Sequence, residues 1–92
     1  MTRLEAALKG ETKKLENKVK RIKLAIETAK LNFKTQKEDA EMELEETMAA
    51  FKEGDVEVIL KRLNNNLEEI ESAEAGLSRI EKLEKLLFEE VQ

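Results

Sequence analysis

The chain breaks its pattern most clearly in the stretch Phe51-Lys52-Glu53-Gly54-Asp55-Val56. Gly54 suits the left-handed backbone conformation that often follows the last turn of a helix. Asp55 suits the N-cap of a following helix, because its carboxylate can accept hydrogen bonds from free backbone N–H groups. The stretch therefore predicts a turn at residues 54–55 that joins two helices.

Both sides of this turn have helical spacing. Apolar residues at alternating steps of four and three predict a first arm over residues 11–53, with extra steps of four near its end that would locally unwind a supercoil. Its expected seam contains these residues: Leu15, Val19, Ile22, Ile26, Ala29, Phe33, Gln36, Ala40, Leu44, Met48 and Phe51. Two rows with a step of seven predict a second arm over residues 56–91: Val56, Leu63, Ile70, Leu77, Glu84 and Val91, and Ile59, Asn66, Ala73, Ile80 and Leu87. Gly76 is expected off this seam.

The two seams match when the arms run antiparallel. Met48 then lies opposite Ile59, Phe33 opposite Ala73, Ala29 opposite Leu77, and Leu15 opposite Val91. In the pairs Phe33–Ala73 and Ala29–Leu77 a large side chain lies opposite a small one, as close packing requires. We predict an all-α fold with a single helical domain over residues 1–92. It is a long, coiled-coil-like antiparallel two-helix hairpin that assembles into a helical bundle by oligomerisation.

Residues 1–10 are expected to form an N-terminal helical extension. Thr2 and Glu5 have the spacing of a capping box, in which each side chain bonds to the other residue's backbone N–H. Met1 and Leu8 keep the heptad phase of Leu15 in the first arm, with Leu4 beside this row, which favours a straight extension. The alternative is a bend at Gly10 that folds the segment back over the end of the second arm.

The composition excludes several functions. Charged residues make up 41% of the chain and aromatic residues 3%, while Pro, Cys and His are absent. Without Cys or His there is no thiol nucleophile, no imidazole base and no usual zinc or haem ligand set. We therefore expect no enzyme, no cofactor and no bound metal. No apolar run is long enough for a membrane span or signal peptide, which favours a cytoplasmic protein.

The charge is divided unevenly along the chain. Residues 1–35 contain ten Lys and Arg against four Asp and Glu, and residues 36–92 contain seven against seventeen. The basic part could bind nucleic acid or an anionic membrane surface. The interpretation that we favour is a solvated face that complements the acidic second arm, since no aromatic residue interleaves the basic ones to stack on bases.

Polar residues interrupt the seams. Gln36 and Asn66 are expected to fix the register of the hairpin, because a polar residue in an apolar seam favours one alignment over others. The alternatives for the run Asn64-Asn65-Asn66 are a local fraying of the helix or an amide patch that binds a partner. Asn66 would lie opposite Ala40 and reach Gln36 or water. Glu84 is expected to extend toward Lys18 or Lys23.

More apolar residues are present than one hairpin can bury. Two helices cover one narrow stripe each, and contiguous exposed apolar surface usually marks an association site. The expected interface consists of residues flanking the seams and in the first ten residues: Leu4, Leu8, Leu24, Leu31, Leu60, Leu67, Leu83, Leu86 and Phe88. This surplus predicts a non-catalytic protein–protein interaction module that forms a dimer of hairpins or docks a partner helix.

The opening residues, Met1-Thr2-Arg3-Leu4-Glu5-Ala6-Ala7-Leu8, resemble the start of the small co-chaperones of type III secretion needle subunits. That resemblance implies a small helical hairpin that masks an aggregation-prone helical subunit with its exposed apolar surface. The chain departs from the family in its longer hairpin and in lacking a second helix with Gln and Tyr. A secretion co-chaperone is therefore an alternative function, and a nucleic-acid or membrane-surface binder is a second one.

Overall fold

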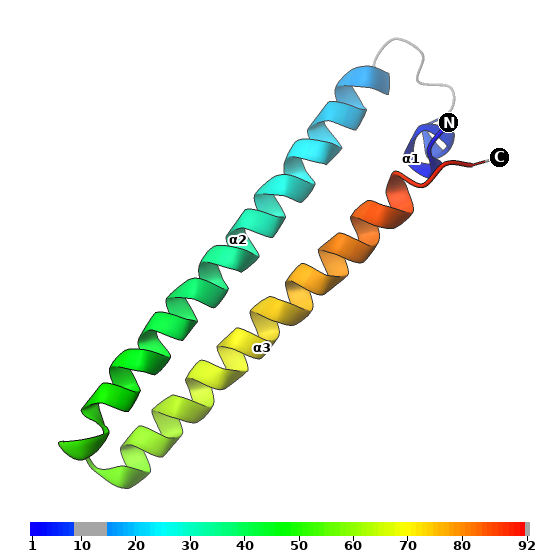
Figure 1. The fold of residues 1–92 in the computed structure, drawn as a ribbon. Helices are drawn as coiled ribbons and strands as arrows, with labels where there is room; N and C mark the ends of the chain where they lie inside the picture. The colour runs from blue at the N-terminus through cyan, green and yellow to red at the C-terminus, as the bar shows by residue number, and fades with distance from the viewer. Residues whose placement is uncertain (9–14, 92) are drawn as a thin grey trace.

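The computed structural model describes residues 1–8 and 15–91 and confirms the all-α helical hairpin. Its elements are α1 (Arg3–Ala7), α2 (Leu15–Ala49), the short 3₁₀ helix η1 (Ala50–Lys52) and α3 (Val56–Leu87). The two long helices run side by side in opposite directions, and α1 lies at the open end of the hairpin (Figure 1). The molecule is a rod of 63 × 21 × 13 Å. None of the described helices is long and apolar enough to span a bilayer.

The turn confirms one prediction and corrects another. The Asp55 carboxylate accepts hydrogen bonds from the backbone N–H groups of Glu57 at 2.9 Å and Val58 at 3.4 Å, so Asp55 is the N-cap of α3. Gly54 is not in the left-handed conformation that we expected. The chain leaves α2 through η1 instead, and a Cβ at Gly54 would lie only 2.7 Å from the Cδ1 atom of Ile59.

The core is one row of side chains from each long helix. Buried residues recur at steps of seven, and this spacing keeps them on one face of each helix. In α2 the position between Ile26 and Ala40 is Phe33, which is half-buried. In α2 the buried residues are Ile26, Ala40 and Thr47, and in α3 they are Ile59, Asn66 and Ala73. The predicted seam of α3 is therefore correct in its centre. The predicted change of step in α2 is wrong, because the row continues from Ala40 by seven to Thr47, and Met48 is 60% exposed.

The register of the two arms differs from the prediction by nearly one heptad. The Asn66 amide donates a hydrogen bond to the Thr47 hydroxyl at 3.1 Å, so Thr47 lies opposite Asn66. The prediction placed the neighbouring Met48 opposite Ile59, which is seven residues before Asn66 in α3. One heptad toward the open end, Ala40 and Ala73 are both buried, which agrees with the same alignment. The shift has a physical cause: η1 and the turn occupy residues 50–55, so that the first two turns of α3 extend past the end of α2.

Gly76 lies against the other helix, and not off the seam as expected. A Cβ at this position would lie 2.3 Å from the Cε1 atom of Phe33, well inside normal contact distance. Phe33 does have a small residue beside it, as predicted, but the required small residue is Gly76. Because Gly76 has no Cβ, the aromatic ring of Phe33 fits between the two helices.

The N-terminal segment is not a straight extension of α2. The capping box is present: Thr2 N–H donates to Glu5 Oε1 at 3.1 Å, and Glu5 N–H donates to Thr2 Oγ1 at 3.2 Å. However, α1 ends at Ala7 and pairs with the chain after α3, through hydrogen bonds from Arg3 N–H to Glu89 O at 2.9 Å and from Val91 N–H to Met1 O at 2.7 Å. These bonds and the burial of Leu4 hold α1 folded back, whereas the role expected for Gly10 lies outside the described residues.

Candidate interaction surface

One long edge of the hairpin is defined by an ion pair between the helices. Lys37 Nζ lies 3.2 Å from Glu74 Oε1. Residues seven apart share a helical face, so Leu44 follows Lys37 along this edge of α2, while Leu67 and Leu60 follow Glu74 along this edge of α3. Both rows therefore run toward the turn on the same side of the molecule.

We call the turn half of this side the apolar edge. Its exposed members are Met48 and Phe51 from the end of the first arm and Leu60 and Leu67 from α3. Leu60 and Leu67 are exposed, as the sequence predicted. Met48 and Phe51 were assigned to the seam, and the structure corrects this, because Thr47 takes the buried position.

Carboxylates border the apolar edge on both helices. Glu45 lies one helical turn from Met48, Glu41 lies two turns from Met48 in the same row, and Glu71 lies one turn from Leu67. All three side chains are exposed. A binding partner that covers the apolar edge would therefore find more stabilisation with basic groups at its margin.

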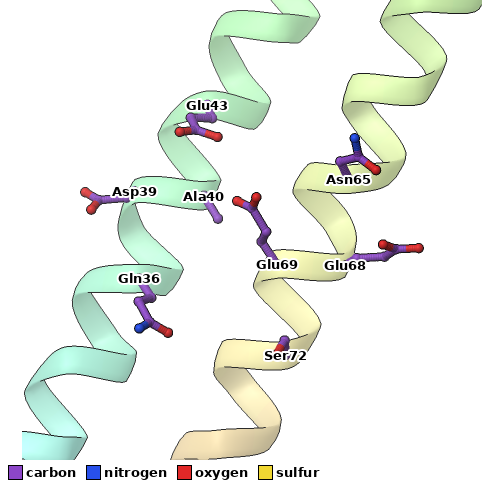
Figure 2. Close-up of a pocket in the computed structure, with 8 residues that line it drawn as sticks. All are labelled: Gln36, Asp39, Ala40, Glu43, Asn65, Glu68, Glu69 and Ser72. Atoms are coloured by element: carbon purple, nitrogen blue, oxygen red, sulfur yellow. The ribbon is translucent and has the colours of Figure 1, made fainter.

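The opposite side of the hairpin has a different chemistry. A groove of about 540 Å³ lies between the helices, and Figure 2 shows the side chains that line it. Its lining is polar apart from Ala40 and consists of these residues: Gln36, Asp39, Ala40, Glu43, Asn65, Glu68, Glu69 and Ser72. We call it the acidic groove. No group of three or more potential ligands in the described part of the chain is arranged to hold a metal ion.

Two exposed leucines form a second apolar feature on α2. Leu24 and Leu31 are 65% and 63% exposed, and their spacing of seven places them on one face. They lie about half a helical circumference away from the buried Ile26 and Phe33, at 100° per residue. We call this pair the leucine stripe. Lys20, Arg21 and Lys34 lie within one turn of this pair, and the acidic Glu27 lies one turn from both leucines.

The remaining predicted interface residues lie mostly at the open end. Leu4 is only 5% exposed and Leu8 is half-buried, so the fold itself covers Leu4 and we withdraw it as an interface residue. Phe88 is half-buried, with Lys23 Nζ 5.2 Å from the centre of its ring. Leu83 and Leu86 are exposed. Leu83 shares the row of Glu69, on the side of the acidic groove.

The polar seam residues have partners that the sequence did not identify. Asn66 is 6% exposed and bonds to Thr47, which is 1% exposed and donates in turn to the Glu43 carbonyl at 2.8 Å. The sequence pattern did not identify Thr47 as the acceptor, because the predicted seam continues from Ala40 through Leu44 and Met48. Gln36 is exposed in the acidic groove and does not contribute to this buried pair.

Glu84 forms its ion pair with Lys30, not with Lys18 or Lys23 as expected. Both side chains are partly buried, and the contact joins α2 to α3 in the open half of the hairpin. The changed partner follows from the changed register, which moves Glu84 toward the middle of α2.

Two titratable groups at the open end have shifted pKa values. Hydrogen bonds from the Thr2 backbone and side chain lower the pKa of Glu5 below the usual value of a glutamate. The hydrogen bond and charge of Glu90 raise the pKa of the Met1 amino group, whose nitrogen lies 2.8 Å from Glu90 Oε2. The shift at Glu5 favours the charged form in the capping box of α1, and the shift at Met1 favours the charged form that joins the N-terminus to the chain after α3.

No known protein family matches this chain, and no curated protein or solved structure is significantly similar to it.

Proposed function

We propose that this chain is a non-catalytic assembly module, a helical hairpin whose exposed apolar side chains bind another helix. The partner helix belongs either to a second copy or to another protein. The observation that carries the proposal is the apolar edge, where Met48, Phe51, Leu60 and Leu67 remain exposed on a hairpin that has already formed its own core.

The small core supports this proposal. Fully buried apolar side chains are few among the described residues: Leu4, Ile26, Ala40, Ile59 and Ala73. A domain of this size rarely obtains comfortable stability from one such core, and association is a common way to bury more apolar area. Covering the apolar edge would remove four large side chains from water.

The test compares two pairs of substitutions on opposite sides of the hairpin. Leu60→Ser with Leu67→Ser changes the apolar edge, and Val58→Ser with Leu83→Ser is the matched control, because Val58 and Leu83 are similarly exposed but lie on the side of the acidic groove. Each protein is studied by light scattering over a concentration series and by affinity capture from a native lysate.

We expect the wild-type chain and the control to form a complex, with themselves or with a captured protein, and the Leu60/Leu67 variant to lose it. Circular dichroism should show equal helix content in all three chains, since the substituted side chains are exposed. A wild-type chain that stays monomeric at several hundred micromolar and captures no protein in a Leu60- and Leu67-dependent manner would contradict the proposal.

A further inference from the structure

We infer that the apolar edge is covered by an amphipathic helix of another protein, about four turns long, with basic residues beside its apolar face. This inference rests on the proposed function and identifies the chemistry of the partner. The apolar face, the length and the charge of the partner helix each follow from a separate feature of the hairpin.

The apolar edge continues inward to the contact between the two long helices. The Lys30–Glu84 ion pair lies on this side of the hairpin, because Lys30 is seven residues from Lys37. Three half-buried apolar side chains lie two or three heptads from this ion pair, in the same rows: Leu44, Leu63 and Ile70. A helix laid along this side would therefore cover one exposed row on each arm and the half-buried row between them.

The length of this apolar surface determines the length of the partner helix. Toward the open end of the rod, the surface stops at the Lys37–Glu74 ion pair. Toward the turn it stops at Val56, which is 55% exposed and lies two heptads from Ile70 on the same face of α3. From Val56 to Ile70, α3 rises about 21 Å at 1.5 Å per residue, so about four turns of a partner helix cover the surface.

The charged residues around the apolar edge are mostly acidic. Those one helical turn from its exposed members are four carboxylates and one lysine, a net charge of −3: Glu45, Asp55, Glu57, Glu71 and Lys52. We call this set the acidic rim. In the described part of the chain, no ion pair engages Glu45, Glu57 or Glu71. Basic residues beside the apolar face of a partner helix would pair with these carboxylates.

The acidic rim also makes a second copy a poorer occupant. Two chains joined through their apolar edges would bring two acidic rims together, and like charges in contact oppose association. The leucine stripe of a second copy is also a poor match for the apolar edge. It has only Leu24 and Leu31, and the acidic Glu27 lies one turn from both. The charges therefore favour a helix from another protein.

Two synthetic peptides of about 18 residues test the inference, a length that spans the apolar surface as a helix. Both have leucines at the same positions, spaced three and four residues apart. The basic peptide has lysines beside this apolar face, and the acidic peptide has glutamates at the same positions. We expect fluorescence anisotropy to give a dissociation constant at least about tenfold lower for the basic peptide at physiological salt.

Charge substitutions assign this preference to the acidic rim. Glu45→Lys with Glu71→Lys should raise the dissociation constant of the basic peptide about tenfold and lower that of the acidic peptide. Lys52→Glu should lower the dissociation constant of the basic peptide about threefold, because it adds a carboxylate to the rim. The matched control is Glu68→Lys with Glu69→Lys, which makes the same change of net charge in the acidic groove and should leave both values near those of the wild type.

The apolar contact is tested with the variants already described. Leu60→Ser with Leu67→Ser should raise the dissociation constant of the basic peptide about a hundredfold with helix content unchanged, and Val58→Ser with Leu83→Ser should not. Unchanged binding to the Leu60/Leu67 variant would show that the peptide is held by charge elsewhere, for example in the acidic groove, and would overturn the inference.

The failure of this inference and the failure of the proposed function give different results. A wild-type dimer in sedimentation that the Leu60/Leu67 variant loses would assign the apolar edge to a second copy, which overturns the inference and supports the proposed function. A basic peptide that binds no better than the acidic one would overturn the inferred charge of the partner. The capture experiment with the Leu60/Leu67 variant would then decide the proposed function alone.

Discussion

Phe33 and Gly76 show how one contact determines which substitutions α3 accepts. Alanine normally stabilises a helix relative to glycine by about 1 kcal/mol. At Gly76, however, the new Cβ would lie 2.3 Å from the Phe33 ring, which must then leave its position between the helices. We expect Gly76→Ala to lower the free energy of unfolding by about 1–2 kcal/mol, measured by urea denaturation, because the packing loss exceeds the gain in helix propensity.

A double-mutant cycle checks the cause of this effect. In a Phe33→Leu background the ring is absent, so Gly76→Ala should become neutral or stabilising. Gly54→Ala is the comparison among the glycines, since its Cβ would meet chiefly the terminal methyl of Ile59, which can rotate. An equal loss from Gly76→Ala in both backgrounds would show that Phe33 is not responsible.

Thr47 and Asn66 form the buried polar contact of the hairpin. Thr47→Val keeps the shape of the side chain but removes the acceptor of the Asn66 amide at a nearly inaccessible position. A buried amide without a partner costs about 1–3 kcal/mol, so we expect the denaturation midpoint to fall accordingly. Thr47→Ser retains the hydroxyl and should cost less. Equal losses for Val and Ser would mean that packing of the methyl group, not the hydrogen bond, stabilises this site.

At the scale of elements, the stability of α1 depends on two ionisable groups whose pKa values are shifted in opposite directions. Glu5 has a lowered pKa, so its stabilising contribution is present above about pH 4.3 and is lost as the pH falls through the folded-state value. The Met1 amino group has a raised pKa, so its contribution is present below about pH 8 and is lost as the pH rises through the folded-state value. The amide protection factors of residues 3–8, which are corrected for the intrinsic pH dependence of exchange, should therefore be largest between these limits.

Glu5→Gln is the control for the acidic limit. Glutamine can keep the capping-box hydrogen bonds but does not titrate. The protection factors in α1 of this variant should no longer fall at low pH, while their fall at alkaline pH remains. An unchanged fall in protection at low pH would show that Glu5 is not the group responsible.

The sequence predicted the helices and their antiparallel pairing because burial along a helix leaves a period that can be traced in the chain. It did not predict the register, because two rows with a step of seven match nearly as well after a shift of one heptad. Two contacts that apolar spacing does not encode distinguish the alignments. They are the Thr47–Asn66 hydrogen bond and the packing of Phe33 against Gly76, where no Cβ is present.

The same limits apply to the candidate surface and to α1. Leu24, Leu31, Leu60 and Leu67 could be predicted as exposed, because one seam covers only a narrow stripe. Met48 could not, since its exposure depends on a polar residue taking the adjacent buried position. The fold-back of α1 rests on backbone hydrogen bonds to the chain after α3, which side-chain periodicity does not encode.

At the scale of the whole molecule, paired cysteines distinguish the two registers. Ala40→Cys with Ala73→Cys joins positions that the structure places at one buried level, and Ala29→Cys with Leu77→Cys joins positions that only the predicted register places together. We expect rapid disulfide formation within one chain for the first pair and little for the second, measured by mobility on non-reducing gels at low protein concentration. The reverse result would restore the predicted register.

The two described ends of the chain meet at the open end of the rod, where Val91 N–H bonds to Met1 O, and the turn lies at the far end (Figure 1). In mechanical terms, a force that pulls residues 1 and 91 apart acts across the axis of the hairpin. It would detach α1 first and then separate α2 from α3 one layer at a time toward Gly54. Tension applied between the turn and the open end would instead load all the layers together, so the rod should resist lengthwise strain far better than opening at its ends.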